Sequence, residues 1–582
     1  MISHTASLFL FLFSALSFTP CPLLGPAYPP FTLNTKDQLI ASSFKNLTES
    51  FDQLSKTHTG PNGDISPNTS FSIVIFSTNN GDAEDEPFFW QYHYTSHALN
   101  ESSSEDTQDV NGNTIYRIGG LTELFTVWSL LITQGDRILN DPVTEHLPEL
   151  ALASEDNRIG RVDWDHVTVG QLASHMSGIA RDYCGHDLSS QGNFQLAGFP
   201  DISEFVLPCC GDSSQCTTSE FINNLATRPP VAPAGATPSY SNIGYQLLGY
   251  ILERKTGLNY SEMVQRHILD PLGMNETTVF APEDPSVGVI PVDMQTSGWS
   301  QRSKGSEAST SMFSNAKDLA LAGKAILNST LLSTAQTRRW LKPLSHTSNT
   351  ANSLGAPWTI YSNGDYPKTP MIDVYTLLSN EGVGEGLYSS YIGLVPDYGI
   401  GYAILSADTK SPADLNAHAD YTEIALEATL GSALAQAAEI FGGNYTVSDN
   451  STNIIPSTMT VLHDKLPGLY IGEFSRNGTN MRKSLAALIG VTNSTDLSIR
   501  LYPTQRGEND DASSGSKQVF RAVLQDMTEF DDGNTPTCVS WMRLDVFQYG
   551  GRGVDEIVFS LDAQGKVVGV DIPALELTLQ KE

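Results

Sequence analysis

Glu123 is the single ionisable side chain in a stretch whose pattern is that of a buried helix. Apolar residues recur there at helical spacing, and Val127 and Leu130 extend the apolar surface to the other side. Tyr240 and Asn242 lie in a Tyr-Ser-Asn segment at the start of a second predicted helix. A carboxylate and a phenol that meet in one pocket can move protons on a bound molecule without forming a covalent intermediate.

The segment Tyr116 to Thr126 resembles the active-site helix of serine β-lactamases, penicillin-binding proteins and related esterases, in which Ser-x-x-Lys follows an Ile-Gly pair. In this chain the position of the serine is Gly120, and the position of the lysine is Glu123. Glycine has no side chain that could attack a carbonyl, and a carboxylate cannot act as the cationic partner of a serine. The resemblance therefore implies the fold and excludes ordinary acyl-enzyme chemistry at this place.

Further motifs carry the same resemblance in the same order along roughly residues 60 to 440. Asp141 to Pro148 resembles the "DDPV…YLP" of the class C β-lactamase-like family, Thr168 to Gly178 its "TVRHLLSHTSGL", and Tyr240 to Asn242 with the following helix its "YSNxGYxLLG". The tail from about residue 457 is similar to the lipocalin-like β-domain of some secreted fungal members.

The family also places a basic residue on a strand beside the catalytic serine. That residue should precede Tyr388, and the position is Asn380 or Glu381, depending on register. The resemblance thus implies a pocket in which Glu123 lies beside Tyr240 and Asn242, while the space of the missing serine at Gly120 is open. We expect Glu123, Tyr240 and Asn242 to be the residues that do chemistry.

Two other features have simpler explanations. Ser314 and Lys317 form a literal Ser-x-x-Lys, but the segment resembles a family helix start at which serine is the N-cap. His175 looks like a turn residue that shapes its loop. The chain has no Gly-x-Ser-x-Gly, no His-Glu-x-x-His and no phosphate-binding loop, so we expect neither a metal nor another cofactor.

The N-terminus has the character of a secretory leader. Leu8 to Phe18 is an apolar run too short for a bilayer span, and a small-residue context follows, so we predict a signal peptide of residues 1–27 cleaved near Ala27. A short transmembrane anchor is the alternative, because only His4 and the terminal amine precede the run. We expect a protein that is secreted or resides in the lumen of the secretory pathway, without a membrane attachment after cleavage.

Sequons and cysteines agree with that compartment. Four cysteines crowd into 33 residues, as loop disulfides would, and their pairing cannot be deduced: they are Cys184, Cys209, Cys210 and Cys216. Ten asparagines stand in Asn-x-Ser/Thr sequons: Asn46, Asn68, Asn100, Asn259, Asn275, Asn328, Asn444, Asn450, Asn477 and Asn493.

The net charge of the chain limits the classes of partner that it can bind. The 65 acidic and 33 basic residues give a net charge of −32, which repels phosphate backbones and anionic lipid surfaces. We therefore expect a small-molecule ligand or substrate rather than nucleic acid or a membrane.

The predicted fold class is α+β, with a β-lactamase/transpeptidase-like domain over residues 28–441, a linker over 442–456 and an antiparallel, barrel-like β-domain over 457–582. Runs at 71–77 and 87–94 predict a hairpin, and two strands return only at 390–405, so distant parts of the chain should close one sheet. Period-two runs predict C-terminal strands at 468–474, 519–524, 541–547, 556–561 and 567–572.

Three functions remain open. The first is a β-lactamase-fold protein that acts on a small organic molecule by non-covalent acid/base chemistry. The second is a ligand-binding pseudoenzyme, and the third is a serine hydrolase or esterase with a displaced nucleophile. Members of the family that the chain resembles act on secondary metabolites, which suggests that ligand class.

Overall fold

The computed structural model describes most of the 582 residues, and the description covers 21–79, 87–102, 109–153, 159–183, 197–200, 217–226, 228–301, 306–363, 372–379, 386–447, 456–509, 515–528 and 539–582. Several predicted features lie outside these residues: Leu8 to Phe18, the four clustered cysteines, Asn380, Glu381 and Asn450. The side chain of Asn100 is also outside them.

Contacts between residues divide the chain into two compact units. The first unit, which we call the sheet unit, comprises residues 32–363 and 373–429. The second, the barrel unit, is built mainly from residues 430–582 together with the described residues 21–31. The boundary lies inside the long helix α13 (Asn416–Phe441).

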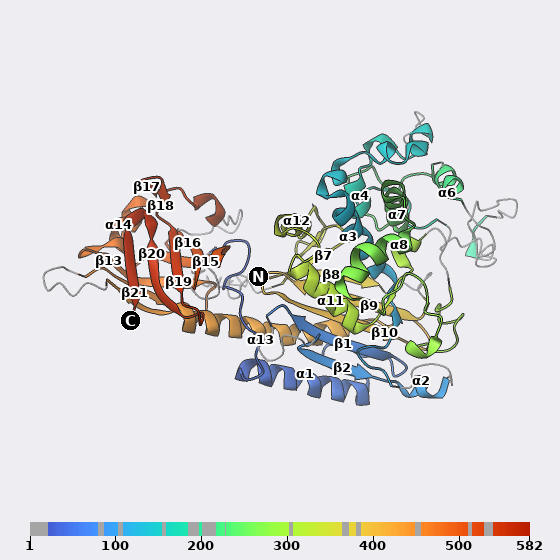
Figure 1. Cartoon of the computed structure of the whole chain (residues 1–582), viewed down its shortest axis with the longest axis horizontal. Helices are drawn as coiled ribbons and strands as arrows, with labels where there is room; N and C mark the ends of the chain where they lie inside the picture. The colour runs from blue at the N-terminus through green and yellow to red at the C-terminus, as the bar shows by residue number, and fades with distance from the viewer. Residues whose placement is uncertain are drawn as a thin grey trace, which may run out of the picture. The chain divides into compact units, whose positions relative to one another are not determined.

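An eight-stranded sheet with the order β2-β1-β10-β9-β8-β7-β6-β5 forms the centre of the sheet unit (Figure 1). Its strands are β1 (Ser70–Ser77), β2 (Trp90–Tyr94), β5 (Ser345–His346), β6 (Asn352–Leu354), β7 (Thr359–Asn363), β8 (Ile372–Ser379), β9 (Tyr388–Val395) and β10 (Ile400–Ala407). β1 pairs antiparallel with both β2 and β10. The predicted hairpin and the closure of one sheet by distant parts of the chain are confirmed.

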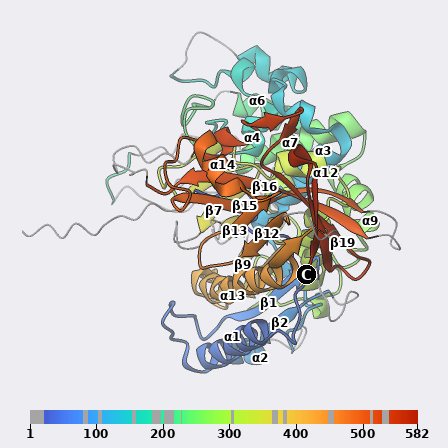
Figure 2. The same cartoon turned by 90° about the vertical axis from the view of Figure 1, so that its left-hand side faces the viewer.

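Side chains on both sides of β1 are buried, because helices cover both faces of this sheet. On one face Phe76 packs against α11 (Ala316–Leu327), where a Cβ at Gly323 would come within 2.3 Å of the Phe76 ring, so glycine allows the close approach. On the other face Phe71 meets α13 at His418, and α1 (Gln38–Thr57) lies beside α13 in both views (Figures 1 and 2).

The part of the chain between β2 and β5 is mainly helical. Its α-helices are α2 (His97–Ser102), α3 (Thr122–Gln134), α4 (Val169–Ala173), α6 (Thr218–Leu225), α7 (Asn242–Thr256), α8 (Tyr260–Val264), α9 (Asp270–Leu272), α10 (Glu307–Thr310) and α12 (Thr334–Trp340). The first ten residues of α3 are buried, as its apolar pattern predicts. α3 packs against α7 and α10, and this packing brings the site residues together.

The barrel unit closes eight strands into an antiparallel barrel, because the order β12-β11-β21-β20-β19-β16-β15-β13 is completed by pairing of β12 with β13. The strands are β11 (Gly443–Thr446), β12 (Thr458–Leu462), β13 (Leu469–Arg476), β15 (Leu497–Asn509), β16 (Ser516–Asp526), β19 (Glu556–Leu561), β20 (Val567–Ile572) and β21 (Leu577–Lys581). α14 (Met481–Leu488) packs against β13. Phe441, Phe520 and Phe559 form an aromatic cluster. The predicted antiparallel β-domain is confirmed.

Smaller elements complete the described secondary structure. The short strands are β3 (Tyr116–Arg117), β4 (Phe313–Ser314), β14 (Thr479–Asn480), β17 (Gln548–Tyr549) and β18 (Arg552–Gly553). The 3-10 and π turns are 119–121, 136–140, 143–145, 148–153, 164–166, 265–269, 285–287, 540–543 and 573–575.

Two predictions differ from the structure. The run 541–547 is not a strand: a 3-10 turn (Ser540–Arg543) begins there, and Trp541 is exposed, because alternation alone does not supply a pairing partner. Residues 443–446, placed in the linker, form β11. Ala27, beside which the signal peptide is predicted to be cleaved, is buried in the barrel unit, and the cleavage itself stays a prediction.

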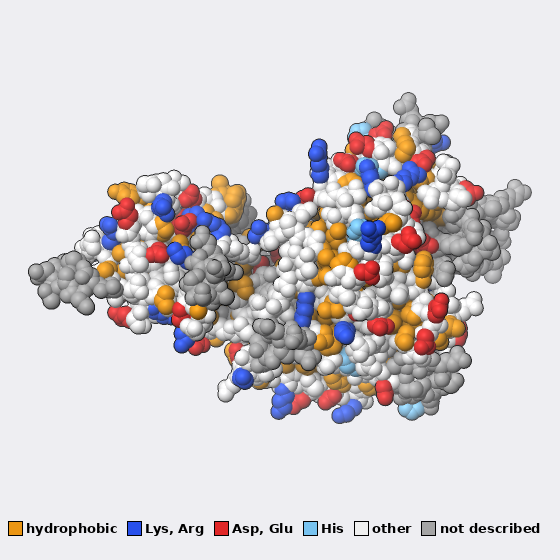
Figure 3. Space-filling view, in the orientation of Figure 1, with side chains coloured by type: hydrophobic (Ala, Val, Ile, Leu, Met, Phe, Trp, Pro, Cys, Tyr) orange, Lys and Arg blue, Asp and Glu red, His pale blue; other side chains and the backbone are white. Residues whose placement is uncertain are grey.

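Charged side chains of both signs are mixed on the surface. On the face drawn in Figure 3, Lys and Arg side chains are scattered among acidic ones.

Among the described helices, α13 alone is long and apolar enough to cross a membrane by length and composition. Its His418 is buried against β1, and its Phe441 belongs to the aromatic cluster of the barrel unit.

Candidate active site

Gly120 lies at the start of the buried helix α3, where β3 turns into a 3-10 turn (Gly119–Leu121). Gly119 makes the bend with a φ of 47°, a left-handed conformation that glycine adopts without strain. The N–H of Gly120 donates a hydrogen bond of 2.8 Å to Oγ of Ser379, the last residue of β8.

The missing side chain at Gly120 leaves a small gap between two hydroxyl groups. A Cβ built at this position would lie 3.4 Å from the Tyr240 hydroxyl oxygen and 3.5 Å from Ser379 Oγ, which are ordinary van der Waals distances. The gap therefore admits an atom of a ligand or of a substituted side chain without a clash. Position 120 thus has room for one carbon atom in contact with both hydroxyl groups, and a larger open space there stays a prediction.

The side chain of Glu123 is linked to this gap through the Tyr240 hydroxyl, and Glu123 is 1% exposed. Its Oε1 accepts a hydrogen bond of 2.9 Å from the Tyr240 hydroxyl and is 3.3 Å from Ser309 Oγ on α10. Its Oε2 is 3.4 Å from Nε2 of His175. Glu123 is thus held by side chains from three separate segments, which satisfies a carboxylate that could not otherwise be buried.

Tyr240 and Asn242 complete the cluster at the start of α7. The Tyr240 hydroxyl is also 3.1 Å from Asn242 Oδ1, and Ser309 Oγ lies 2.5 Å from the same oxygen. The shorter of its two contacts assigns the Tyr240 proton to Glu123, whereas the Ser309 hydroxyl has an acceptor within hydrogen-bond distance in both Asn242 Oδ1 and Glu123 Oε1. The amide of Asn242 donates to Asp182 Oδ1 at 2.6 Å. The structure therefore brings the three predicted residues together.

His175 has a larger part in the cluster than its sequence context predicts. It does occupy a turn, with a φ of 56°. Its Nδ1 accepts a hydrogen bond of 3.2 Å from the backbone N–H of Ser241, so a neutral ring carries its proton on Nε2, the atom that faces Glu123. The ring also packs 4.5 Å from the ring of Tyr240. His175 orients both members of the Glu123–Tyr240 pair.

Both positively and negatively charged side chains lie near Tyr240. The guanidinium of Arg181 lies 4.8 Å from the Tyr240 ring centre, and its Nε is 3.2 Å from Asp182 Oδ2. On α7, burial first and the negative charge of Glu123 second raise the pKa of Tyr245 well above its usual value. Because Tyr240 is half-buried and Glu123 is fully buried, Tyr240 is the member of the pair that a ligand can reach.

Simple motifs in the sequence do not reveal Ser309, Ser379 or Asp182. Ser309 belongs to the short helix α10, and Ser379 ends a strand just before the predicted basic position. One capping expectation also differs from the structure: the N-cap of α11 is Asn315 rather than Ser314, one residue from the expected position. Ser241 is the N-cap of α7.

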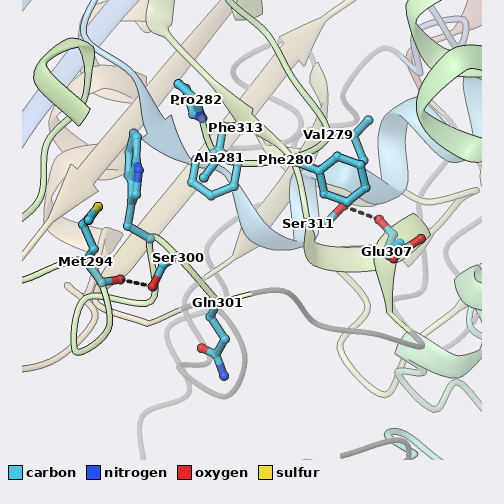
Figure 4. Close-up of a pocket in the computed structure, with 11 residues that line it drawn as sticks. Val279, Phe280, Ala281, Pro282, Met294, Ser300, Gln301, Glu307, Ser311 and Phe313 are labelled. Carbon is cyan, nitrogen blue, oxygen red and sulfur yellow. Dashed lines mark hydrogen bonds between the residues drawn. The ribbon is translucent and has the colours of Figure 1, made fainter. Parts of the chain in front are cut away.

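A cavity of about 210 Å³ lies on the side of α10 that carries Glu307 and Ser311 (Figure 4). Its walls combine apolar side chains, among them Phe280, Met294 and Phe313, with polar ones such as Gln301 and Glu307. Glu307 is the first residue of α10 and Ser311 its C-cap, whereas Ser309 between them contacts Glu123. The helix thus separates this cavity from the Glu123 cluster.

The sequon asparagines whose side chains are described are all exposed or half-buried: Asn46, Asn68, Asn259, Asn275, Asn328, Asn444, Asn477 and Asn493. Asn259 also caps α8 by accepting from the N–H of Glu262, and Asn444 accepts from Thr460. Their glycosylation stays a prediction.

Comparison with known proteins decides the family. The Beta-lactamase family model matches residues 90–427, more than half of the chain. The chain belongs to the beta-lactamase family. A second model, described as "Beta-lactamase-like-like, C-terminal domain", matches residues 433–582, so the barrel unit of this beta-lactamase-family protein also has relatives.

Three relatives that match most of the chain come from fungi. A "Beta-lactamase-like protein" of Arthroderma benhamiae is 29% identical, with 95% of each chain covered. A "Probable hydrolase clz13" of Cochliobolus lunatus is 23% identical, with 87% of each covered, and a "Probable hydrolase M10" of a Phoma species is 22% identical, with 95% of this chain and 89% of the relative covered. Among solved structures, a class C beta-lactamase is 16% identical at a TM-score of 0.46, with 68% and 98% covered.

Proposed function

We propose that this beta-lactamase-family protein acts on a small organic molecule, of the secondary-metabolite class, by acid/base chemistry without a covalent intermediate. The observation that carries the proposal is the 2.9 Å hydrogen bond from the half-buried Tyr240 hydroxyl to the buried Glu123 carboxylate, beside the gap at Gly120. A ligand atom in that gap would lie next to the phenol.

Tyr240 and Glu123 have different roles in this proposal. Tyr240 touches the ligand: it takes a proton from a water or ligand atom as its own proton passes to Glu123 Oε1, or it runs the same transfer in reverse. Glu123 is the buried proton acceptor. His175 Nε2 and Ser309 Oγ hold the two carboxylate oxygens, so the acceptor is pre-oriented before the ligand arrives.

The same geometry argues against an acyl-enzyme at position 120. Glycine supplies no nucleophile, and the negative charge of Glu123 beside Tyr240 disfavours the phenolate that would deprotonate one. Two relatives are named probable hydrolases, and hydrolysis is compatible with the proposal if water rather than a side chain attacks. Tyr240 would then accept the proton of the water.

The experiment uses a chromogenic ester, p-nitrophenyl butyrate, and a β-lactam, nitrocefin, as probes of turnover. We expect Tyr240→Phe to reduce any turnover by ~10²–10⁴-fold, because the phenyl ring keeps the packing and removes the proton. Tyr250→Phe, on the same helix α7 but away from the Glu123 cluster, is the matched control and should retain activity. Equal activity in wild type and Tyr240→Phe would exclude the proposed role. Saturable binding without consumption in wild type would instead identify a pseudoenzyme.

One observation favours a second candidate, a hydrolase with a displaced nucleophile. The hydroxyl of Ser379 borders the gap, 2.8 Å from the N–H of Gly120. In that mechanism Ser379 Oγ would form a bond to the acyl carbon as the bond to the leaving group breaks, and the leaving group would depart with the proton of the serine hydroxyl. A fluorophosphonate would label Ser379 in the same way, with loss of fluoride. Labelling that disappears in Ser379→Ala would support this candidate against the leading one. Turnover without labelling would support water attack.

A further inference from the structure

The first described residues of the chain belong to the barrel unit. Cys21, Ala27, Tyr28 and Phe31 are each at most 4% exposed, although they lie about 400 residues or more before the barrel strands in sequence. A segment of this kind is built into a domain rather than attached to its surface. We refer to residues 21–31 as the N-terminal strap.

Polar contacts fasten the beginning of the strap beside β16. The backbone N–H of Cys21 donates a 3.0 Å hydrogen bond to Oε1 of Gln525, which is itself buried. The carbonyl of Pro22 accepts a 3.0 Å hydrogen bond from Ser540 Oγ. Gln525 and Ser540 would lose these partners without the strap, and a buried polar group without a partner is destabilising.

The end of the strap reaches a different part of the same unit. Tyr28 donates to the carbonyl of Leu466, and burial raises its pKa to about 12 against the opposing charge of Arg500. In addition, Cys21 is disulfide-bonded. The strap is therefore held by a covalent bond at one end and by a buried aromatic side chain at the other.

We propose that the mature protein retains residues 21–31 as a part of the barrel unit, so that removal of the N-terminal leader stops at or before residue 21. Cleavage near Ala27, the position expected from the sequence, would remove Cys21 with its disulfide and strip partners from Gln525 and Ser540. The cut would be an ordinary peptide hydrolysis, with water supplying the new carboxylate oxygen and the proton of the new amine.

With the strap retained, the barrel unit consists of residues from both ends of the chain. The sequence that matches the C-terminal family model, residues 433–582, lacks the strap. The unit can therefore be completed only when both ends of the chain are present. A disulfide at Cys21 also requires an oxidising compartment, in which a disulfide-carrying oxidant takes up two electrons and two protons from the two thiols.

The test expresses the full chain in a eukaryotic secretory host and determines the N-terminus of the deglycosylated product by mass spectrometry. We expect the first residue to be at position 21 or before it. A folded product that begins between residues 22 and 31 would overturn the proposal. A peptide map without reductant should show the Cys21 peptide cross-linked, and a free Cys21 thiol would also contradict it.

A matched pair of variants tests the stabilising role. Cys21→Ser should lower the unfolding temperature of the barrel unit by roughly 5–15 °C. Leu24→Ala changes a strap residue that is 79% exposed and should leave the unfolding temperature unchanged. Equal unfolding temperatures for the two variants would show that the strap carries no stability. If Cys21→Ser is not secreted, the N-terminus and the peptide map of the wild type still decide the proposal.

Discussion

Two buried charges in this molecule, Glu123 in the sheet unit and Arg500 in the barrel unit, are held by different kinds of partner. Arg500 is 3% exposed, and its Nη1 donates to the carbonyls of Leu466, Pro467 and Gly468, while Nη2 pairs with Asp464. All these partners belong to one short loop. Glu123 is held by His175, Tyr240 and Ser309, side chains from three segments that meet beside a gap.

The difference separates a structural charge from a candidate catalytic one. A charge bound by consecutive backbone carbonyls fixes a loop and offers nothing to a ligand. A charge bound by side chains around an open position can exchange protons with whatever enters it. Burial alone does not distinguish the two cases, whereas the origin of the partners does.

The largest expected effect tests the Glu123–Tyr240 pair as one unit. Tyr240→Phe and Glu123→Gln should each reduce kcat by ~10²–10⁴-fold. The kcat of the double variant should be no lower than that of the less active single variant, because both substitutions break the same proton transfer. Turnover of p-nitrophenyl butyrate by the four proteins measures this. Multiplicative losses in the double variant would mean that the residues act separately.

The second prediction concerns stability rather than turnover. Arg500→Met removes the loop contacts and should destabilise the barrel unit by about 2–3 kcal/mol, because hydrogen bonds to a charged group are lost in a buried place. Thermal or urea unfolding measures it, with the exposed Arg552→Met as control. Turnover should not change. A loss of activity at unchanged stability would break the contrast between the two buried charges.

His418 offers a third kind of buried group. Neither ring nitrogen makes a hydrogen bond of normal geometry, and burial, opposed by the charge and backbone of Asp414, lowers the pKa of His418 from 6.5 to about 4. Since the unfolded chain takes up the proton first, stability should be complete above pH 6.5 and fall by about 3 kcal/mol as the pH drops from 6.5 to 4.

Unfolding free energies of wild type and His418→Leu at several pH values test this prediction. The variant should have a flatter profile between pH 6.5 and 4. His166→Gln replaces a histidine with a 78% exposed side chain and should keep the wild-type slope. An unchanged slope in His418→Leu would place the pH dependence elsewhere, for example at half-buried His93, whose pKa burial also lowers to about 4.

The smallest effect is expected from restoring the serine. Gly120→Ser should fold as stably as wild type, within about 0.5 kcal/mol, because the new Cβ meets its neighbours at ordinary distances. It should not become an acylating hydrolase, because Glu123 still stands where a cation is needed. Fluorophosphonate labelling and nitrocefin turnover measure both points. Labelling of the introduced serine would show that the charge of Glu123 does not prevent activation.

Much of the architecture could be predicted from local patterns. The hairpin at 71–94, the buried helix after Gly120 and four of the eight barrel strands, β13, β16, β19 and β20, follow from periodicity, because each element must bury one face. The run 541–547 shows the limit of that reasoning. Its alternation is that of a strand, yet it forms a turn with Trp541 exposed, since pairing depends on a neighbour that the run itself does not specify.

For the candidate active site, too, some features follow from the sequence and others only from the tertiary structure. Sequence alone determined that position 120 has no side chain, that position 123 carries a carboxylate in an apolar helix and that Tyr240 and Asn242 begin another helix. Only the tertiary structure decided that His175, Ser309 and Ser379 surround them and that the strap at Cys21 completes the barrel unit. The physical reason is distance along the chain. These contacts join segments tens to hundreds of residues apart, and their geometry is set by how buried faces pack rather than by any local pattern.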